Sequence, residues 1–287
     1  MFVTRINCRR PHAMKAWILT LCFTFSPCLA QAPTPAPPAP GAPPATAPND
    51  ASLAAPSKEV DDLLHRLEKV SKETKTLHAR LRYDAIQGEV RDEQRRFGNL
   101  VYQAGPPASF GVHFDRILVE SGGKKISRLS NRWYIFDGQW LVEKLEDRKQ
   151  FFKWQVVSPQ TKEEDADPLA LGRGPFVVPV ALRRDLVVRK FEASIVEPNE
   201  KSDPKNSVHL KLTPRQGVKM QFAEIHLWYD KDTLLPQRAR TRDDSKNESI
   251  VELSEVQLNK PIEGKPLETA EPKEAGWEIQ VTPWSGK

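Results

Sequence analysis

The chain has 287 residues, of which 43 are Lys or Arg and 38 are Asp or Glu, for a formal net charge of +5 at pH 7. The first 32 residues hold four of the basic side chains and no acidic one, so the remainder is close to neutral. This balance removes the main support for nucleic-acid binding, which needs a basic surface. All three cysteines, Cys8, Cys22 and Cys28, lie in the same stretch, so the rest of the chain has no thiol for disulfide, metal or nucleophile chemistry.

The N-terminus has the three parts of a secretory signal. Basic residues precede an apolar run over 16–25, and small residues follow it around Ala30 and Ala32. The run is shorter than the ~20 residues with which a helix spans a bilayer. We therefore predict a signal peptide over residues 1–32, with Met14 as the initiator, and export to the periplasm.

Residues 33–56 consist mainly of Pro, Ala, Thr and Gly, with almost no charge. A segment of this composition cannot bury enough apolar surface to fold, and its prolines favour extended polyproline II. We predict a disordered linker.

A helical pattern begins after this linker. Val60, Leu63, Leu64 and Leu67 recur at helical spacing, and Ser57 stands in the position of an N-cap. This predicts one amphipathic helix that ends near residue 76.

Short strand-like runs then follow one another to the end of the domain. They cover residues 77–86, 97–103, 110–118, 132–144, 150–157, 189–196, 207–212, 224–229, 235–241 and 249–256. Asp137-Gly138 separates two aromatic runs and is a strong hairpin signal. The pattern predicts a mainly β protein, an unclosed antiparallel barrel of about ten strands in one domain over 57–262. The charged tail over 263–287 is expected to lie loosely along the barrel, with one short strand at 276–281.

Two strings carry a resemblance to a known family. Residues 227–238 read Leu-Trp-Tyr-Asp-Lys-Asp-Thr-Leu-Leu-Pro-Gln-Arg, and residues 252–262 read Glu-Leu-Ser-Glu-Val-Gln-Leu-Asn-Lys-Pro-Ile. They resemble the last hairpins of the periplasmic outer-membrane lipoprotein carriers, the LolA-like family. The resemblance implies a monomeric, non-enzymatic carrier without a cofactor or metal. Such a carrier binds the acyl chains of lipoproteins and passes them from an inner-membrane ABC-type releaser to an outer-membrane acceptor.

In that family, short helices cap an apolar cavity that takes the acyl chains. For the cavity the resemblance implies seven aromatic residues, Trp133, Phe136, Trp140, Phe152, Trp154, Phe222 and Trp228. The segment 168–182 is the candidate lid, because its apolar residues lie between Gly and Pro joints. Its lid residues are Leu169, Leu171, Phe176, Val177, Val178, Val180 and Leu182. The alternative for this segment is a structural loop that closes one end of the core.

One position departs from the family. Its carriers often hold the lid through an arginine before a proline, where this chain has Gln103-Ala104-Gly105-Pro106-Pro107. Two alternatives to the carrier therefore stay open: a lipid- or protein-binding regulatory domain of the same fold, and a structural envelope protein with a filled core.

Residues of catalytic type do not form a known motif. The five histidines beyond the signal are isolated in sequence, and no zinc, calcium or phosphate-loop pattern occurs. They are interpreted as surface residues. Arg238, Arg240 and Arg242 alternate along one strand and are interpreted as a solvated face balanced by neighbouring carboxylates, with docking of acidic groups as the alternative.

Overall fold

The computed structural model describes the following residues: 55–88, 93–121, 123–160, 177, 180–218 and 220–285. The predicted signal and nearly all of the linker lie outside them. The described residues belong to one compact unit, Ser52–Lys287. No helix in this described part is long and apolar enough to cross a membrane.

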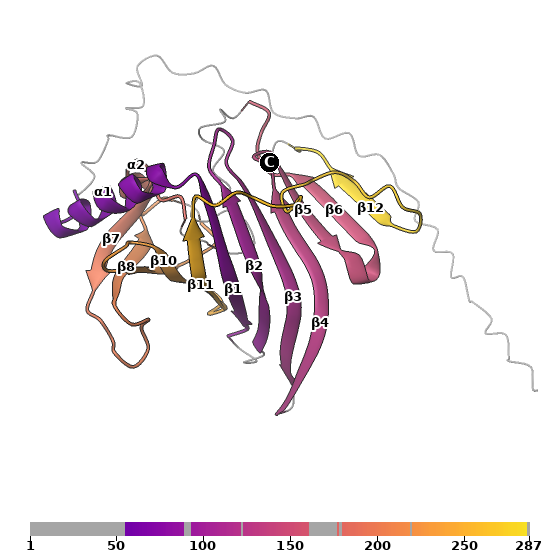
Figure 1. The fold of residues 1–287 in the computed structure, drawn as a ribbon. Helices are drawn as coiled ribbons and strands as arrows, with labels where there is room; N and C mark the ends of the chain where they lie inside the picture. The colour runs from indigo at the N-terminus through magenta and orange to yellow at the C-terminus, as the bar shows by residue number, and fades with distance from the viewer. Residues whose placement is uncertain are drawn as a thin grey trace, which may run out of the picture. The chain divides into compact units, whose positions relative to one another are not determined.

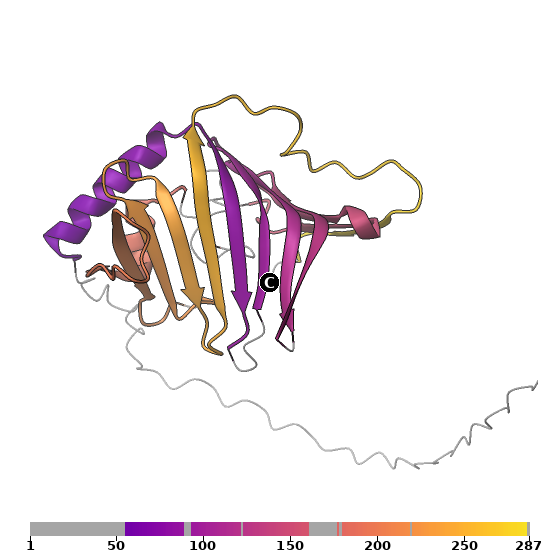
Figure 2. The ribbon, with the colours of Figure 1, turned by 60° about the horizontal axis from the view of Figure 1, so that its bottom comes forward.

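Twelve strands form a single sheet. In chain order they are β1 (Thr76–Ile86), β2 (Glu93–Gln103), β3 (Ser109–Ser121), β4 (Lys124–Phe136), β5 (Trp140–Leu145), β6 (Gln150–Gln155), β7 (Phe191–Val196), β8 (Ser207–Pro214), β9 (Glu224–Asp230), β10 (Pro236–Arg242), β11 (Glu248–Leu258) and β12 (Glu278–Thr282). Their spatial order is β12-β6-β5-β4-β3-β2-β1-β11-β10-β9-β8-β7. Neighbours are antiparallel except β12, which runs parallel to β6. The predicted unclosed antiparallel sheet is confirmed, and it curves strongly (Figures 1 and 2).

Local sequence explains the elements that the prediction placed correctly. The helix α1 (Lys58–Glu73) begins after Ser57, whose Oγ accepts a hydrogen bond from the Val60 amide at 3.4 Å. At the β4–β5 hairpin, Asp137 Oδ1 accepts hydrogen bonds from the amides of Gln139 and Trp140 at 3.0 and 2.7 Å. Gly138 there has φ 101°, a backbone conformation that favours glycine.

Several elements differ from the prediction. The expected strand over 189–196 starts as a second helix, α2 (Arg184–Lys190), and β7 begins only at Phe191. The strand β4 begins at Lys124, eight residues before the expected start, because this exposed stretch pairs with the end of β3 without burying its own side chains. A short 3₁₀ helix, η1 (Glu146–Arg148), joins β5 to β6.

The main hydrophobic core lies on the inner, concave face of the sheet. Strand alternation turns Leu77, Ala79 and Leu81 of β1 to this face, where they are buried. The buried side of α1, including Leu64 at 0 % exposure, packs into the same cluster. Figures 1 and 2 show both helices beside β7 and its neighbouring strands.

Residues 259–284 cross the outer, convex face of the sheet and are called the strap here. Figure 1 shows the strap in front of β1, β2 and β3 on its way to β12. Thr76 Oγ1 donates to the Lys260 carbonyl at 2.7 Å, and Lys153 Nζ donates to the Thr269 carbonyl at 3.2 Å. A Cβ at Gly111 would lie 2.2 Å from the Pro266 carbonyl oxygen, so the backbones approach closely there.

The strap ends on a second, smaller core. Trp277 packs against Ile135, Val142 and Phe151 on the outer face of β4, β5 and β6. Its β12 segment then adds to the edge of β6. The tail therefore has specific contacts along its length, in contrast to the loose tail that the sequence suggested.

Candidate functional site on the inner face

The inner face has two halves, and the helices pack on only one of them. The covered half is formed by β7–β11 and β1 and carries the fully buried Leu210, Leu212, Ile225 and Leu227 beneath α1 and α2. The open half is formed by β2–β6. There, buried residues such as Phe114 give way to Tyr134, Phe152 and Trp154, which are only partly buried.

Strand alternation divides the seven predicted cavity aromatics between the two faces. Cross-strand pairing places Phe136, Phe152 and Trp154 on the inner face, and Phe222 packs against the main core. The rings of Phe152 and Trp154 stack with centroids 5.8 Å apart. The other three residues, Trp133, Trp140 and Trp228, lie on the outer face, because they occupy the alternate positions of their strands.

The predicted lid is described only at its C-terminal end. Leu169, Leu171, Phe176 and Val178 lie outside the described residues. Val177, Val180 and Leu182 are buried in the main core, with 4, 6 and 5 % exposure.

This end of the segment is tied to α1. Ser71 Oγ donates to the Val180 carbonyl at 3.1 Å and accepts from the Leu182 amide at 3.0 Å. Arg184 Nε then donates to Asp61 Oδ1 at 2.7 Å. Residues 180–184 are therefore anchored to α1.

A hollow in the covered half, between α1, Val180, Leu182 and the β9–β10 turn, measures about 10 Å³. That volume is at the lower limit for one water molecule. This hollow is therefore too small for an acyl chain.

The open half ends in a basic hollow of about 410 Å³, called the arginine groove here, whose lining includes Arg96, Arg128, Arg132 and Arg148. An aromatic row separates the groove from the core. The ring of Phe114 lies 6.1 Å from Tyr83 and 6.2 Å from Tyr134.

Two of these arginines contact the aromatic row. The guanidinium of Arg96 lies 5.7 Å from the Tyr83 ring centre, and that of Arg132 lies 5.9 Å from the Tyr134 ring centre. Burial, followed by the nearby carboxylate of Glu143, raises the pKa of Tyr134, so its hydroxyl stays protonated and donates to Glu143 Oε1 at 2.8 Å. The sequence did not predict the groove, because its arginines lie on three separate elements. The only local signal was that Arg96 and Arg132 each occupy a strand position that faces inward.

The outer face of the covered half carries paired charges. Arg238, Arg240 and Arg242 contact Glu252, Glu248 and Glu224 at 2.6, 3.6 and 3.0 Å respectively. The expected balance by neighbouring carboxylates is confirmed.

A histidine pair lies among these charges. His209 Nε2 and His226 Nδ1 are 2.8 Å apart, and the ring of Trp228 stacks on His209 with centroids 4.1 Å apart. Burial, together with the charge of His226, lowers the pKa of His209 to about 4. His209 is only 7 % exposed, unlike the surface residue that was expected. No cluster of potential metal ligands occurs among the described residues.

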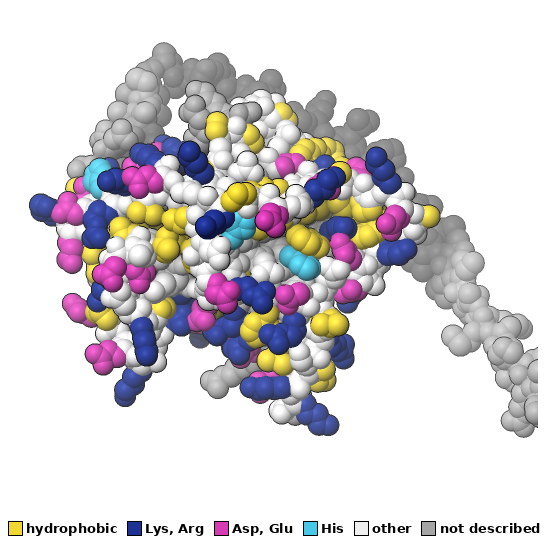
Figure 3. All heavy atoms as spheres, viewed as in Figure 1, with side chains coloured by type: hydrophobic (Ala, Val, Ile, Leu, Met, Phe, Trp, Pro, Cys, Tyr) yellow, Lys and Arg dark blue, Asp and Glu magenta, His cyan; other side chains and the backbone are white. Residues whose placement is uncertain are grey.

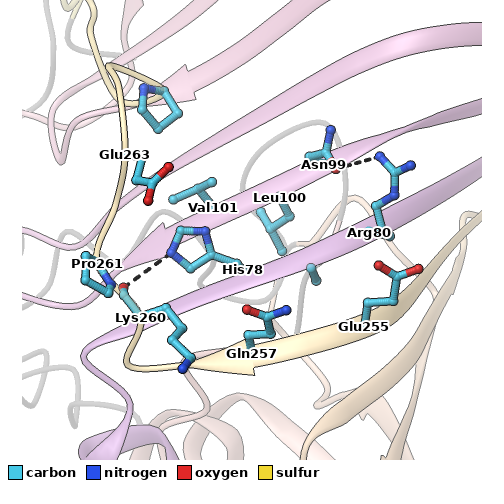
Figure 4. A pocket seen from close by; sticks show the side chains of 12 residues that line it. His78, Arg80, Asn99, Leu100, Val101, Glu255, Gln257, Lys260, Pro261 and Glu263 are labelled. Carbon is cyan, nitrogen blue, oxygen red and sulfur yellow. Dashed lines mark hydrogen bonds between the residues drawn. The ribbon is translucent and has the colours of Figure 1, made fainter.

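A second hollow, of about 640 Å³, lies on the outer face beneath the strap (Figure 4). His78, Arg80 and Asn99 point into it from β1 and β2, and Glu263 reaches it from the strap. Arg80 Nη1 donates to Asn99 Oδ1 at 2.9 Å. Its lining mixes these charged and polar side chains with apolar ones such as Leu100 and Val101.

Comparison with known proteins gives matches only among solved structures. No family model matches the chain, and no curated protein sequence matches it. An uncharacterized conserved protein from Thermus thermophilus has a TM-score of 0.43 and 15 % identity, over 79 % of this chain and 100 % of that one. A LolA superfamily protein from Nitrosomonas europaea has a TM-score of 0.32 and 10 % identity, over 71 % of this chain and 94 % of that one.

The complex of MucA and MucB from Pseudomonas aeruginosa has a TM-score of 0.36 and 13 % identity, over 74 % of this chain and 61 % of that one. The similar structures thus include a member of the LolA superfamily, the family that the two sequence strings resemble. At these scores the likeness concerns general architecture and does not bear on function.

Proposed function

We propose that this protein is a periplasmic carrier that holds the acyl chains of lipoproteins on the open half of its inner face. It would receive them from an inner-membrane ABC-type releaser and deliver them to an outer-membrane acceptor. The observation that supports the proposal is the apolar surface of Tyr134, Leu141, Phe152 and Trp154, which is only partly buried beside a well-packed core.

The physical argument is the cost of exposed apolar surface. Each Å² of it removed from water stabilises a complex by about 25 cal/mol, so acyl chains laid on this surface would be stabilised in transit. In the covered half, by contrast, the described parts of α1, α2 and the Val180–Leu182 stretch pack into the main core. The stacked rings of Phe152 and Trp154 give the chains a flat apolar platform.

The test uses two tryptophans on adjacent strands that face opposite ways. Trp154 pairs with Leu141 on the inner face, and Trp140 pairs with Gln155 on the outer face. The mature protein, purified from a host with a cell envelope, is examined by native mass spectrometry and lipid extraction. We expect acylated ligand on the wild type and on Trp140→Ala, and at least about tenfold less on Trp154→Ala, as loss of a large aromatic contact implies.

Two results would contradict the carrier. One is a wild-type protein that carries no acylated ligand and takes up no diacylated peptide added to it. The other is equal retention by both tryptophan variants, which would show that the inner face is not the site. A protein that binds no lipid would direct attention to the regulatory or structural alternatives.

A further inference from the structure

Arginines in different parts of the sheet differ in their charge partners. On the outer face Arg95 pairs with Asp84 at 2.8 Å, and the Arg238 to Arg242 series pairs with glutamates. In the arginine groove, Arg132 pairs with Glu143 at 3.2 Å. Among the described residues, Arg96, Arg128 and Arg148 have no ion pair with a carboxylate. Along the described lining of the groove, positive charges therefore outnumber negative ones.

Among the described residues that line the groove, Asp147 is the one carboxylate, and its single negative charge cannot balance three arginines. Asp147 Oδ2 accepts a hydrogen bond from the backbone amide of Asn131 at 2.9 Å and thereby fixes the start of η1 against β4. Arg96 Nη2 donates to the neutral side chain of Gln94 at 3.0 Å, and the exposed guanidinium groups of Arg128 and Arg148 remain available to an external anion. Arginine is well suited to phosphate because its planar fork of donors matches the phosphate oxygens.

Exposed apolar side chains lie beside these charges. Leu129 is 89 % exposed and Ile126 is 43 % exposed, and both belong to the β3–β4 hairpin, next to the exposed Lys124 and Arg128. Figure 1 shows β3 and β4 extending beyond their neighbours, and Figure 3 shows basic and apolar side chains together at that end. Basic groups mixed with exposed Leu and Ile are the composition of a surface that lies in a lipid headgroup region.

From these observations we propose that the end of the β3–β4 hairpin and the arginine groove form a docking surface for an anionic phospholipid bilayer. Arg96, Arg128 and Arg148 bind headgroup phosphates, and Leu129 and Ile126 enter the headgroup layer. Charge complementarity selects an anionic surface over a neutral one. The inference goes beyond the proposed function, since it concerns the surface on which the protein docks and not the ligand on its inner face.

The experiment is co-sedimentation of the mature protein with large vesicles. One set contains phosphatidylcholine alone, and the other contains phosphatidylcholine with about one third phosphatidylglycerol. We expect binding to the anionic vesicles and at least tenfold less to the neutral ones. Binding should weaken as the salt concentration rises from about 0.05 to 0.5 M, because the Debye length shrinks from above 10 Å to below 5 Å.

Variants assign the effect to the groove. Each arginine near an anionic surface contributes about fivefold in affinity, so the double variant Arg128→Gln/Arg148→Gln should bind about 25-fold more weakly. The matched control, Lys69→Gln/Lys72→Gln on the exposed side of α1, removes the same charge and should lose at most about twofold. Leu129→Ser should also weaken binding, about fivefold. The size of this loss should be the same at low and high salt, because it comes from apolar contact.

Three results would overturn the proposal. They are equal binding to the two vesicle types, an unchanged double variant, or displacement of the protein from vesicles by low millimolar inorganic phosphate, which would make the groove a phosphate site. Acylated ligand that co-purifies with the Arg128→Gln/Arg148→Gln variant is measured in parallel. If the variant loses vesicle binding but keeps its ligand, the docking surface is separate from the ligand site. If the protein carries no ligand but still binds vesicles, the carrier proposal fails and the docking proposal stands.

Discussion

The two halves of the sheet are covered on opposite faces. In the covered half, α1 and α2 fill the inner face, and paired charges such as Arg238 and Glu252 face solvent outside. In the open half, the strap crosses the outer face and Trp277 closes a small core there, while the inner face keeps partly exposed aromatic residues. The comparison shows that one curved sheet can be stabilised by packing on either of its faces.

The largest expected effect comes from a substitution in the core of the covered half. Leu64 of α1 has 0 % exposure in the main core, so Leu64→Ala should lower the free energy of unfolding by about 2–5 kcal/mol through lost burial and a residual cavity. Urea unfolding monitored by circular dichroism measures this loss. The control is Leu129→Ala, which should change the free energy by less than about 0.5 kcal/mol because the side chain is 89 % exposed. Similar losses in both variants would show that α1 does not pack as described.

The second effect concerns pH and the outer face of the covered half. The pKa of His209 is lowered to about 4 in the folded protein, below its ordinary value near 6.5, so the unfolded chain binds a proton more readily. Stability is therefore fully present above pH 6.5 and is lost as the pH falls toward 4, by roughly 1–3 kcal/mol from this group.

Urea unfolding at pH 7, 5.5 and 4 tests this expectation. His209→Asn should show a smaller fall in stability over this range than the wild type. His65→Asn on α1, where the side chain is exposed, serves as the control and should follow the wild type. An unchanged pH profile in His209→Asn would show that the histidine pair does not cause the dependence.

The smallest expected effect tests the contact between the strap and the outer face of the open half. A Cβ in Gly111→Ala would lie 2.2 Å from the Pro266 carbonyl oxygen, so the strap has to lift. We expect faster amide hydrogen exchange in residues 260–282 and a global loss of only about 1–2 kcal/mol, because the main core is unaffected. Amide exchange in β8 and β9 of the covered half is the internal control and should not change. Unchanged exchange in the strap would contradict the close approach at Gly111.

Much of the fold was predictable because it depends on local rules. Periodic apolar residues predicted α1, turn chemistry at Asp137-Gly138 predicted a hairpin, and β-rich runs predicted most strands. The start of β4 at Lys124 was missed because its side chains do not alternate between apolar and polar, and its pairing with β3 alone makes it a strand. The helix α2 was missed because Val187 and its neighbours also fit a strand, and packing against α1 and β7 decides between the two.

The candidate site was also predictable only in part. Sequence by itself determined that aromatic residues such as Trp140 and Trp154 occupy strands, since strand propensity and turn residues act over a few positions. Only the tertiary structure decided that Trp154 faces inward and Trp140 outward, because one residue of register turns a side chain to the opposite face. It also brought Arg96, Arg128 and Arg148 to one groove, because sheet pairing joins residues that are far apart in the chain.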